Sequence, residues 1–94
     1  MTENQFRDFF EHGIVEHVRL VHVPNVGTAI EYMLAGGEVG MIDTKRGGVK
    51  GYRTDTALQF LKSVGVRQVV ADLTRWQELH QGELNLSAPS EARR

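Results

Sequence analysis

The chain contains no cysteine, only two prolines and no long apolar run. Without thiols it can form neither disulfide bonds nor thiolate metal sites. The longest apolar stretch, near residues 18–23, is interrupted by Arg19 and His22 and is far too short to span a membrane. The first five residues are polar and lack the basic start and apolar run of a secretory signal. We therefore expect a cytoplasmic protein.

The chain is close to neutral overall, but its charge is unevenly distributed. The formal net charge is −1; residues 1–38 carry six acidic and two basic side chains, whereas residues 39–53 carry four basic and one acidic. A near-neutral total argues against strong, sequence-independent binding to nucleic acid. The basic segment still allows a local contact with an anion.

The length of 94 residues predicts a single α/β domain over residues 1–82, followed by a polar tail over residues 83–94 that we expect to be disordered. A domain of this size buries only about 60% of its unfolded surface, so self-association would help its stability. A homodimer formed by edge strands, or by a first helix carrying Phe6, Phe9 and Phe10, is consistent with that small core. The alternative is that this helix only covers an edge of the core.

Hydrophobic periodicity, caps and turn residues define the predicted elements. Helices are predicted over residues 2–12, 25–35, 54–65 and 72–82, and strands over residues 14–23, 39–45, 49–53 and 66–71. The helix over 25–35 depends on Asn25 as its N-cap and on an apolar stripe of Val26, Ala29, Ile30, Met33 and Leu34. Between the terminal helices the order β-α-β-β-α-β predicts an α+β protein, a ferredoxin-like two-layer sandwich with extra N- and C-terminal helices. The alternative is an irregular α+β sheet in which residues 66–71 are helical.

A β-hairpin across the glycine pair at positions 47–48 is central to this prediction. If the two glycines form the loop, Asp43 faces Tyr52 and Lys45 faces Lys50. Alternation along the two strands then gives one shared face, made of Met41, Asp43, Lys45, Lys50 and Tyr52.

One stretch of this hairpin, Asp43-Thr44-Lys45, looks like half of the motif of restriction-endonuclease-like nucleases. In that motif an acid holds Mg²⁺ and a lysine orients or activates water. The acid of the preceding strand is missing here, because residues 13–42 contain no aspartate. A divergent metal-dependent nuclease is therefore an alternative, and a surface salt-bridge pattern is the favoured interpretation.

A second stretch, Lys50-Gly51-Tyr52, is similar to the start of the aromatic stretch on the third strand of RNA-recognition motifs. Residues 20–26 are loosely similar to the corresponding stretch on the first strand. The resemblance implies that single-stranded bases stack on aromatic side chains of the open sheet face. The first strand has no aromatic residue and Thr54 stands where a second one is expected, so a single-stranded nucleic-acid binder is kept as an alternative.

The sequence predicts no cofactor site and no metal site. His12, His17 and His22 recur every five residues, which fits neither a helix face nor one face of a strand. Serine is scarce and cysteine is absent, so a nucleophilic triad has no basis. We therefore expect a protein that is not an enzyme.

Residues 53–76 have the pattern of a capped helix followed by a strand. The pattern consists of Arg53-Thr54-Asp55-Thr56-Ala57-Leu58-Gln59-Phe60-Leu61, then Gly65-Val66-Arg67, Val70-Ala71-Asp72 and Trp76. This pattern resembles the second half of small uncharacterised proteins encoded on bacterial plasmids, some of them associated with partition genes. The resemblance covers residues 53–76, about a quarter of the chain. It implies an accessory role on a mobile element and assigns no functional residues.

Together these patterns predict a small binding module that contacts a protein partner, or nucleic acid, through the open sheet face and the basic hairpin over residues 45–53. The predicted contact residues are Lys45, Arg46, Lys50, Tyr52, Arg53, His17 and Arg19.

Overall fold

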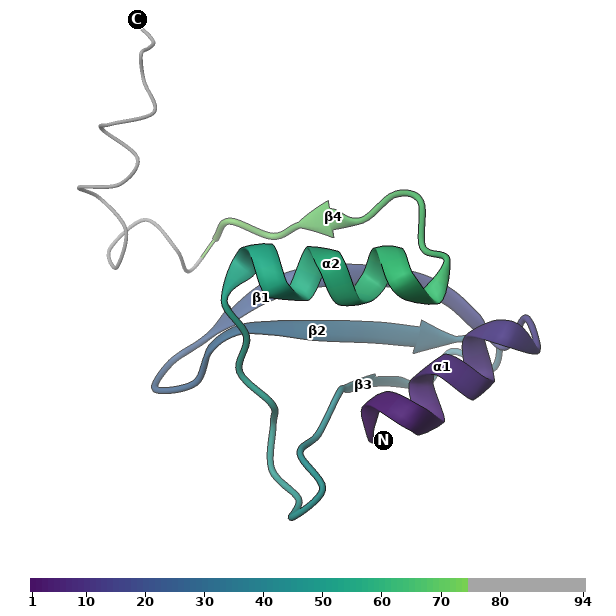
Figure 1. Cartoon of the computed structure of the whole chain (residues 1–94), viewed down its shortest axis with the longest axis horizontal. Coiled ribbons are helices and arrows are strands. Elements are labelled where there is room, and N and C mark those ends of the chain that lie inside the picture. Colours follow the sequence, from purple (N-terminus) through teal and green to yellow (C-terminus); the bar gives the residue numbers. More distant parts are fainter. Residues whose placement is uncertain (75–94) are drawn as a thin grey trace, which may run out of the picture.

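The computed structural model describes residues 1–74. Their elements are α1 (Glu3–Glu11), β1 (Val15–Val23), β2 (Gly27–Leu34), β3 (Val39–Met41), α2 (Thr54–Val64) and β4 (Val70–Ala71). The strands form one sheet in the order β3-β2-β1-β4, in which β1, β2 and β3 are antiparallel neighbours and β4 runs parallel to β1. Both helices lie on the same side of the sheet (Figure 1). The predicted α+β class is confirmed.

Helix α1 begins with a capping box that satisfies free N–H groups at its first turn. The backbone N–H of Gln5 donates to the Thr2 hydroxyl, and the backbone N–H of Thr2 donates to the Gln5 side chain at 2.8 Å. The cap directs the phenylalanine side of the helix onto the sheet, and Phe6 is fully buried. Phe9 packs against the same core, so this side of α1 is an internal surface.

The predicted helix over residues 25–35 is wrong, because residues 27–34 form strand β2. Pro24 and Asn25 are the central residues of a turn, closed by a 3.0 Å hydrogen bond from the Val26 N–H to the Val23 carbonyl. Asn25 has a φ of +66°, which fits the third position of a type II turn and not an N-cap. The turn joins β1 and β2 into a hairpin, and the ferredoxin-like order is consequently not confirmed.

The predicted hairpin over residues 39–53 is wrong in its register. Asp43 pairs with Val49, whereas the prediction paired it with Tyr52. The chain follows β2 as far as Ile42, whose N–H donates to the Ile30 carbonyl at 3.0 Å, and it returns at Tyr52, whose N–H donates to the Thr28 carbonyl at 2.8 Å. Residues 43–51 therefore form an excursion from the sheet edge, here called the basic loop, which projects away from the sheet (Figure 1).

Helix α2 ends at Gly65, which takes a left-handed conformation with a φ of +117°. Residues 66–69 form no regular element and lead into β4, so the predicted strand over 66–71 is reduced to Val70–Ala71, and the alternative in which residues 66–71 are helical does not hold. The N–H of Asp72 donates to the Leu20 carbonyl at 2.8 Å and continues the pairing with β1. The connection through α2 thus places β4 next to β1, on the edge opposite β3.

The core fills the space between the two helices and one face of the sheet. Its buried apolar side chains are Phe6, Leu20, Ile30, Tyr32, Leu34, Ile42, Ala57 and Leu61. Within residues 1–74 no helix is both long and apolar enough to cross a membrane. Residues 72–74, the start of the predicted helix over 72–82, are not helical; the rest of that predicted helix and the predicted tail over 83–94 lie outside the described residues.

Candidate functional site

The strongest candidate site is the face of the sheet that points away from α1 and α2. Strand alternation and register give its members: His17, Arg19, Val21 and Val23 from β1, Ala29, Glu31 and Met33 from β2, Val39 and Met41 from β3, and Val70 from β4. We call this set the open face. No helix of the described residues covers it (Figure 1).

A charged group occupies the centre of the open face. The Arg19 guanidinium donates to Glu31 on the neighbouring strand, and its Nη1 lies 3.5 Å from the Asp72 carboxylate. The hydrogen bond and the charge of Glu31, with a smaller contribution from Asp72, raise the pKa of Arg19 above its ordinary value. Two carboxylates beside one guanidinium make the group slightly acidic, which disfavours contact with a polyanion.

Apolar side chains surround these charges. Val39 is 61% exposed and Val70 is 67% exposed, and Met33 and Met41 are half-buried. A hollow of about 390 Å³ lies on the side of Val21, and another of about 340 Å³ lies on the side of Met33; both are lined by Arg19 and Glu31. An apolar margin around a paired charge is the composition expected of a protein interface.

The basic loop forms a separate surface at the sheet edge. Lys45 and Arg46 lie in its exposed tip, where the Gly47 N–H donates to the Thr44 carbonyl at 3.0 Å. Lys50 and Arg53 are close to carboxylates, with Lys50 Nζ 3.2 Å from Glu3 and Arg53 Nε 3.5 Å from Asp55. Of the four basic contacts predicted in the hairpin over residues 45–53, only the two at the tip have no ion pair among the described residues.

Tyr52 was predicted to lie on the open face, and this is wrong. The sheet register places it on the helix side, where its ring stacks on Phe60 with centroids 6.3 Å apart. Its hydroxyl donates to Glu3 at 2.6 Å, and the Lys50 ammonium lies 5.3 Å from the centre of its ring. Burial and the Glu3 carboxylate both raise the pKa of the Tyr52 phenol. Tyr52 therefore connects α1 to the basic loop inside the fold. Its ring contacts Phe60 and Lys50 and is not presented on the open face for stacking with a base.

The nuclease alternative loses its geometric basis. Lys45 lies in a turn, so strand alternation no longer places it beside Asp43. The Asp43 carboxylate lies 2.9 Å from the Met1 ammonium. Within residues 1–74 no three histidine or acidic side chains gather in an arrangement that could hold a metal ion.

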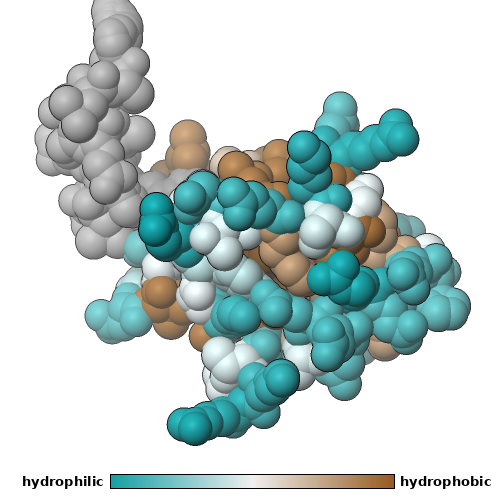
Figure 2. Space-filling view, viewed as in Figure 1, coloured by the Kyte–Doolittle hydropathy of each residue, from teal (hydrophilic) through white to brown (hydrophobic). Residues whose placement is uncertain are grey.

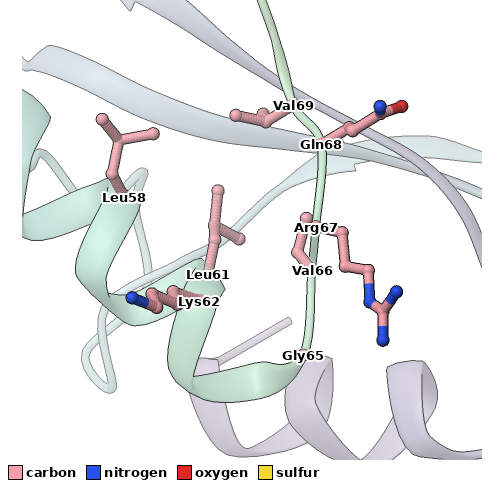
Figure 3. A pocket seen from close by; sticks show the side chains of 8 residues that line it. All are labelled: Leu58, Leu61, Lys62, Gly65, Val66, Arg67, Gln68 and Val69. Atoms are coloured by element: carbon pink, nitrogen blue, oxygen red, sulfur yellow. The ribbon is translucent and has the colours of Figure 1, made fainter.

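A further groove lies between α2 and the segment leading to β4. Leu58, Leu61 and Val69 form its apolar wall, whereas Arg67 and Gln68 point away from it (Figure 3). On the side of the molecule that carries the helices, hydrophobic surface gathers over this region, and the end with the basic loop is hydrophilic (Figure 2). The groove has a volume of about 440 Å³ and brings no two charged or nucleophilic groups into contact.

Sequence reasoning found part of the open face and missed the rest. It named His17 and Arg19, and the structure brings both onto this face. It missed Glu31 and Met33 because residues 25–35 were predicted to be helical. It did not name Val39, Met41 or Val70 as contacts, because their place on this face depends on the pairing of β3 with β2 and of β4 with β1. The signal that could have found β2 is the alternation of Thr28, Ile30, Tyr32 and Leu34, all of which are buried.

Comparisons of the chain with protein-family models, with curated proteins and with solved structures gave no match.

The contact between Tyr52 and Glu3 makes a testable prediction about pH. Burial acts to raise the pKa of Glu3, but the hydrogen bond from Tyr52 and the ammonium of Lys50 outweigh it, so this pKa lies below its ordinary value. A carboxyl group whose pKa is lower in the folded than in the unfolded protein stabilises the fold at pH values above its unfolded pKa. That contribution is lost as the pH falls through the pKa of the group in the folded protein. We expect Tyr52→Phe to lower the free energy of unfolding by about 1 kcal/mol at neutral pH, discounted for partial exposure.

Urea denaturation at neutral and at strongly acidic pH measures this effect. The difference between Tyr52→Phe and wild type should shrink in acid, where Glu3 is protonated in both proteins. Glu3→Gln is the matched control and should flatten the pH dependence in the same way. An equal loss of stability at both pH values would show that the phenol acts without the carboxylate.

Proposed function

We propose that the chain is a small, non-enzymatic binding module that contacts a protein through the open face. The observation that supports this most directly is an apolar sheet surface, centred on the pair of Arg19 and Glu31, that no helix of residues 1–74 covers. Covering exposed apolar surface of this kind with a partner is favourable, because it removes that surface from water. The slight acidity of the central group favours a protein over a nucleic acid as that partner.

An accessory role on a bacterial mobile element belongs to the same proposal. It is supported only by the sequence resemblance over residues 53–76, which is independent of the open face. A binding module without its own chemistry fits such a role, because its contribution would be to bring other macromolecules together.

Site-specific photocrosslinking in the native host tests the proposed surface. Met33 is replaced by p-benzoylphenylalanine in one variant, and Gln59, which is exposed on α2, is replaced in the control. We expect an adduct with a polypeptide from position 33 and none from position 59, with mass spectrometry identifying the peptide that is attached. Adducts at neither position, or only at position 59, would contradict binding through the open face.

The nucleic-acid alternative has one specific observation in its favour, the exposed pair Lys45 and Arg46 at the tip of the basic loop. Two phosphate contacts give a slope of about −1.8 in a plot of log K against log salt, so binding should fall about tenfold between 50 and 200 mM salt. We expect any binding of labelled single- or double-stranded DNA at low salt to disappear in the double variant Lys45→Ala and Arg46→Ala. Tight binding that persists at high salt would reverse the preference for a protein partner.

A further inference from the structure

We infer that the partner that fits the open face is a second copy of this chain, in a two-fold symmetric, face-to-face dimer. This inference rests on the proposed function and makes its partner specific. Its basis is the order of side chains across the sheet, because the order read from one edge is complementary in charge to the order read from the other edge.

The central row of the open face crosses all four strands. The register pairs Met41 of β3 with Glu31 of β2, Glu31 with Arg19 of β1, and Arg19 with Val70 of β4. From one edge to the other the row therefore reads apolar, acidic, basic, apolar. Charges of opposite sign lie on the two inner strands, and apolar side chains lie on the two outer strands.

A two-fold axis parallel to the strands and between β1 and β2 exchanges β1 with β2 and β3 with β4 on the facing copy. Arg19 of one copy then lies over Glu31 of the other, and Met41 lies over Val70. Aligned sheets pack face to face with their strands about 30° apart, so these residues meet near the axis. Each row of one copy therefore faces a complementary row of the other, as an isologous interface requires.

The neighbouring rows of the open face agree with this arrangement. Val21 and Ala29 are paired on β1 and β2, and the same axis places Val21 opposite Ala29 of the facing copy; both are already buried within one chain, at 8% and 0% exposed, so this row forms a dry floor beside the charges and adds little new contact. On the other side of the central row, His17 and Met33 are paired, and His17 faces Met33. The ion pairs therefore lie between the apolar pair Val21 and Ala29 on one side and Met33 with the exposed His17 on the other. Less water around the charges strengthens the attraction between them.

The arginine has the donors that such a dimer needs. A guanidinium carries five N–H donors, and the contacts within one chain use the Nε towards Glu31 and one Nη1 towards Asp72. Donors remain for a carboxylate of the facing copy, so each Arg19 can bridge two chains. Four carboxylates and two guanidinium groups then meet at the interface, two acids and one base from each copy.

Two charge-reversal variants test the dimer. Arg19→Glu gives a face whose central charges are all negative, and Glu31→Arg gives one where positive charge prevails on the two inner strands. Each variant alone should place like charges opposite each other, and we expect its dimer Kd to rise at least about tenfold. When the two variants are mixed in equal amounts, opposite charges face each other again, and a heterodimer should form with a Kd near that of the wild type.

Analytical ultracentrifugation over a wide range of protein concentration measures all four samples, with Lys62→Glu as the control. Lys62 is exposed on α2, on the other side of the sheet, and its reversal should leave the wild-type dimer unchanged. Circular dichroism verifies that each variant is folded. Recovery in the mixture separates a contact between chains from a purely internal role of the Arg19–Glu31 pair, because mixing cannot restore a pair within one chain.

Three outcomes would overturn the inference: a wild type that stays monomeric, a dimer insensitive to both reversals, or a mixture that does not associate. They are distinguishable from failure of the proposed function. If position 33 captures a different polypeptide while the wild type is monomeric, the open face binds protein but not its own copy. If position 33 captures nothing, the open face is not an interface at all.

Discussion

Phe6→Ala is expected to lower the free energy of unfolding by about 3–5 kcal/mol, because the substitution empties the space of a fully buried aromatic ring. The ring is 0% exposed and lies within 6.4 Å, centroid to centroid, of three other aromatic rings. These rings belong to Phe10 of α1, Tyr32 of β2 and Phe60 of α2, so Phe6 joins both helices to the sheet. For a domain of this size, 1 kcal/mol corresponds to about 4–8 °C in melting temperature.

Urea denaturation of wild type and variant measures this loss. The matched control is Leu58→Ala, which removes a large side chain that is 43% exposed, and it should cost less than about 1 kcal/mol. A small effect of Phe6→Ala, similar to that of Leu58→Ala, would mean that the phenylalanine side of α1 does not face the core. It would then support the alternative in which that side of α1 binds a partner.

Local signals in the sequence were enough to place α1, β1 and α2. The two helices have a clear helical periodicity, β1 is rich in β-branched residues, and each element has a recognisable end, such as Gly65 after α2 or Pro24 after β1. Residues 27–34 carry two periodicities at once. Ala29, Ile30 and Met33 fit a helix stripe, and Thr28, Ile30 and Tyr32 fit strand alternation, so the local pattern does not decide. The decision comes from pairing with β1, a contact between segments that the sequence does not reveal.

The same difference between local signals and long-range pairing applies to the candidate site. His17 and Arg19 could be named because β1 was identified from its own residues, whereas Glu31 and Asp72 reach Arg19 only through strand pairing. The predicted face of Tyr52 depended on the register that was assigned to the hairpin around Gly47 and Gly48. The observed pairing of Asp43 with Val49 differs from the predicted one by three residues, an odd number, and an odd shift moves a side chain to the other face. Register, which is set by long-range contacts, therefore decides which surface a residue joins.

Gly51→Ala is the second large expected effect, with a loss of about 3 kcal/mol in the free energy of unfolding. A Cβ atom at position 51 would lie 2.3 Å from the Val26 carbonyl oxygen and 3.1 Å from Val26 Cγ1. Neither backbone can easily move away. Val26 is held in the turn between β1 and β2 by its bond to the Val23 carbonyl, and the chain after Gly51 is fixed by the bond from Tyr52 to Thr28.

Gly36→Ala is the control for the intrinsic effect of adding a methyl group, since no atom lies within 4 Å of the new Cβ and no left-handed φ is required there. It should change the free energy of unfolding by no more than about 0.5 kcal/mol. Urea midpoints of both variants and the wild type give the comparison. Equal midpoints for the two variants would show that the basic loop does not rest on the turn between β1 and β2. In the structure the backbone of Gly51 lies against Val26, and this close approach allows Tyr52 to pair with Thr28 at the edge of β2. Equal midpoints would mean that the pairing of Tyr52 does not depend on this approach.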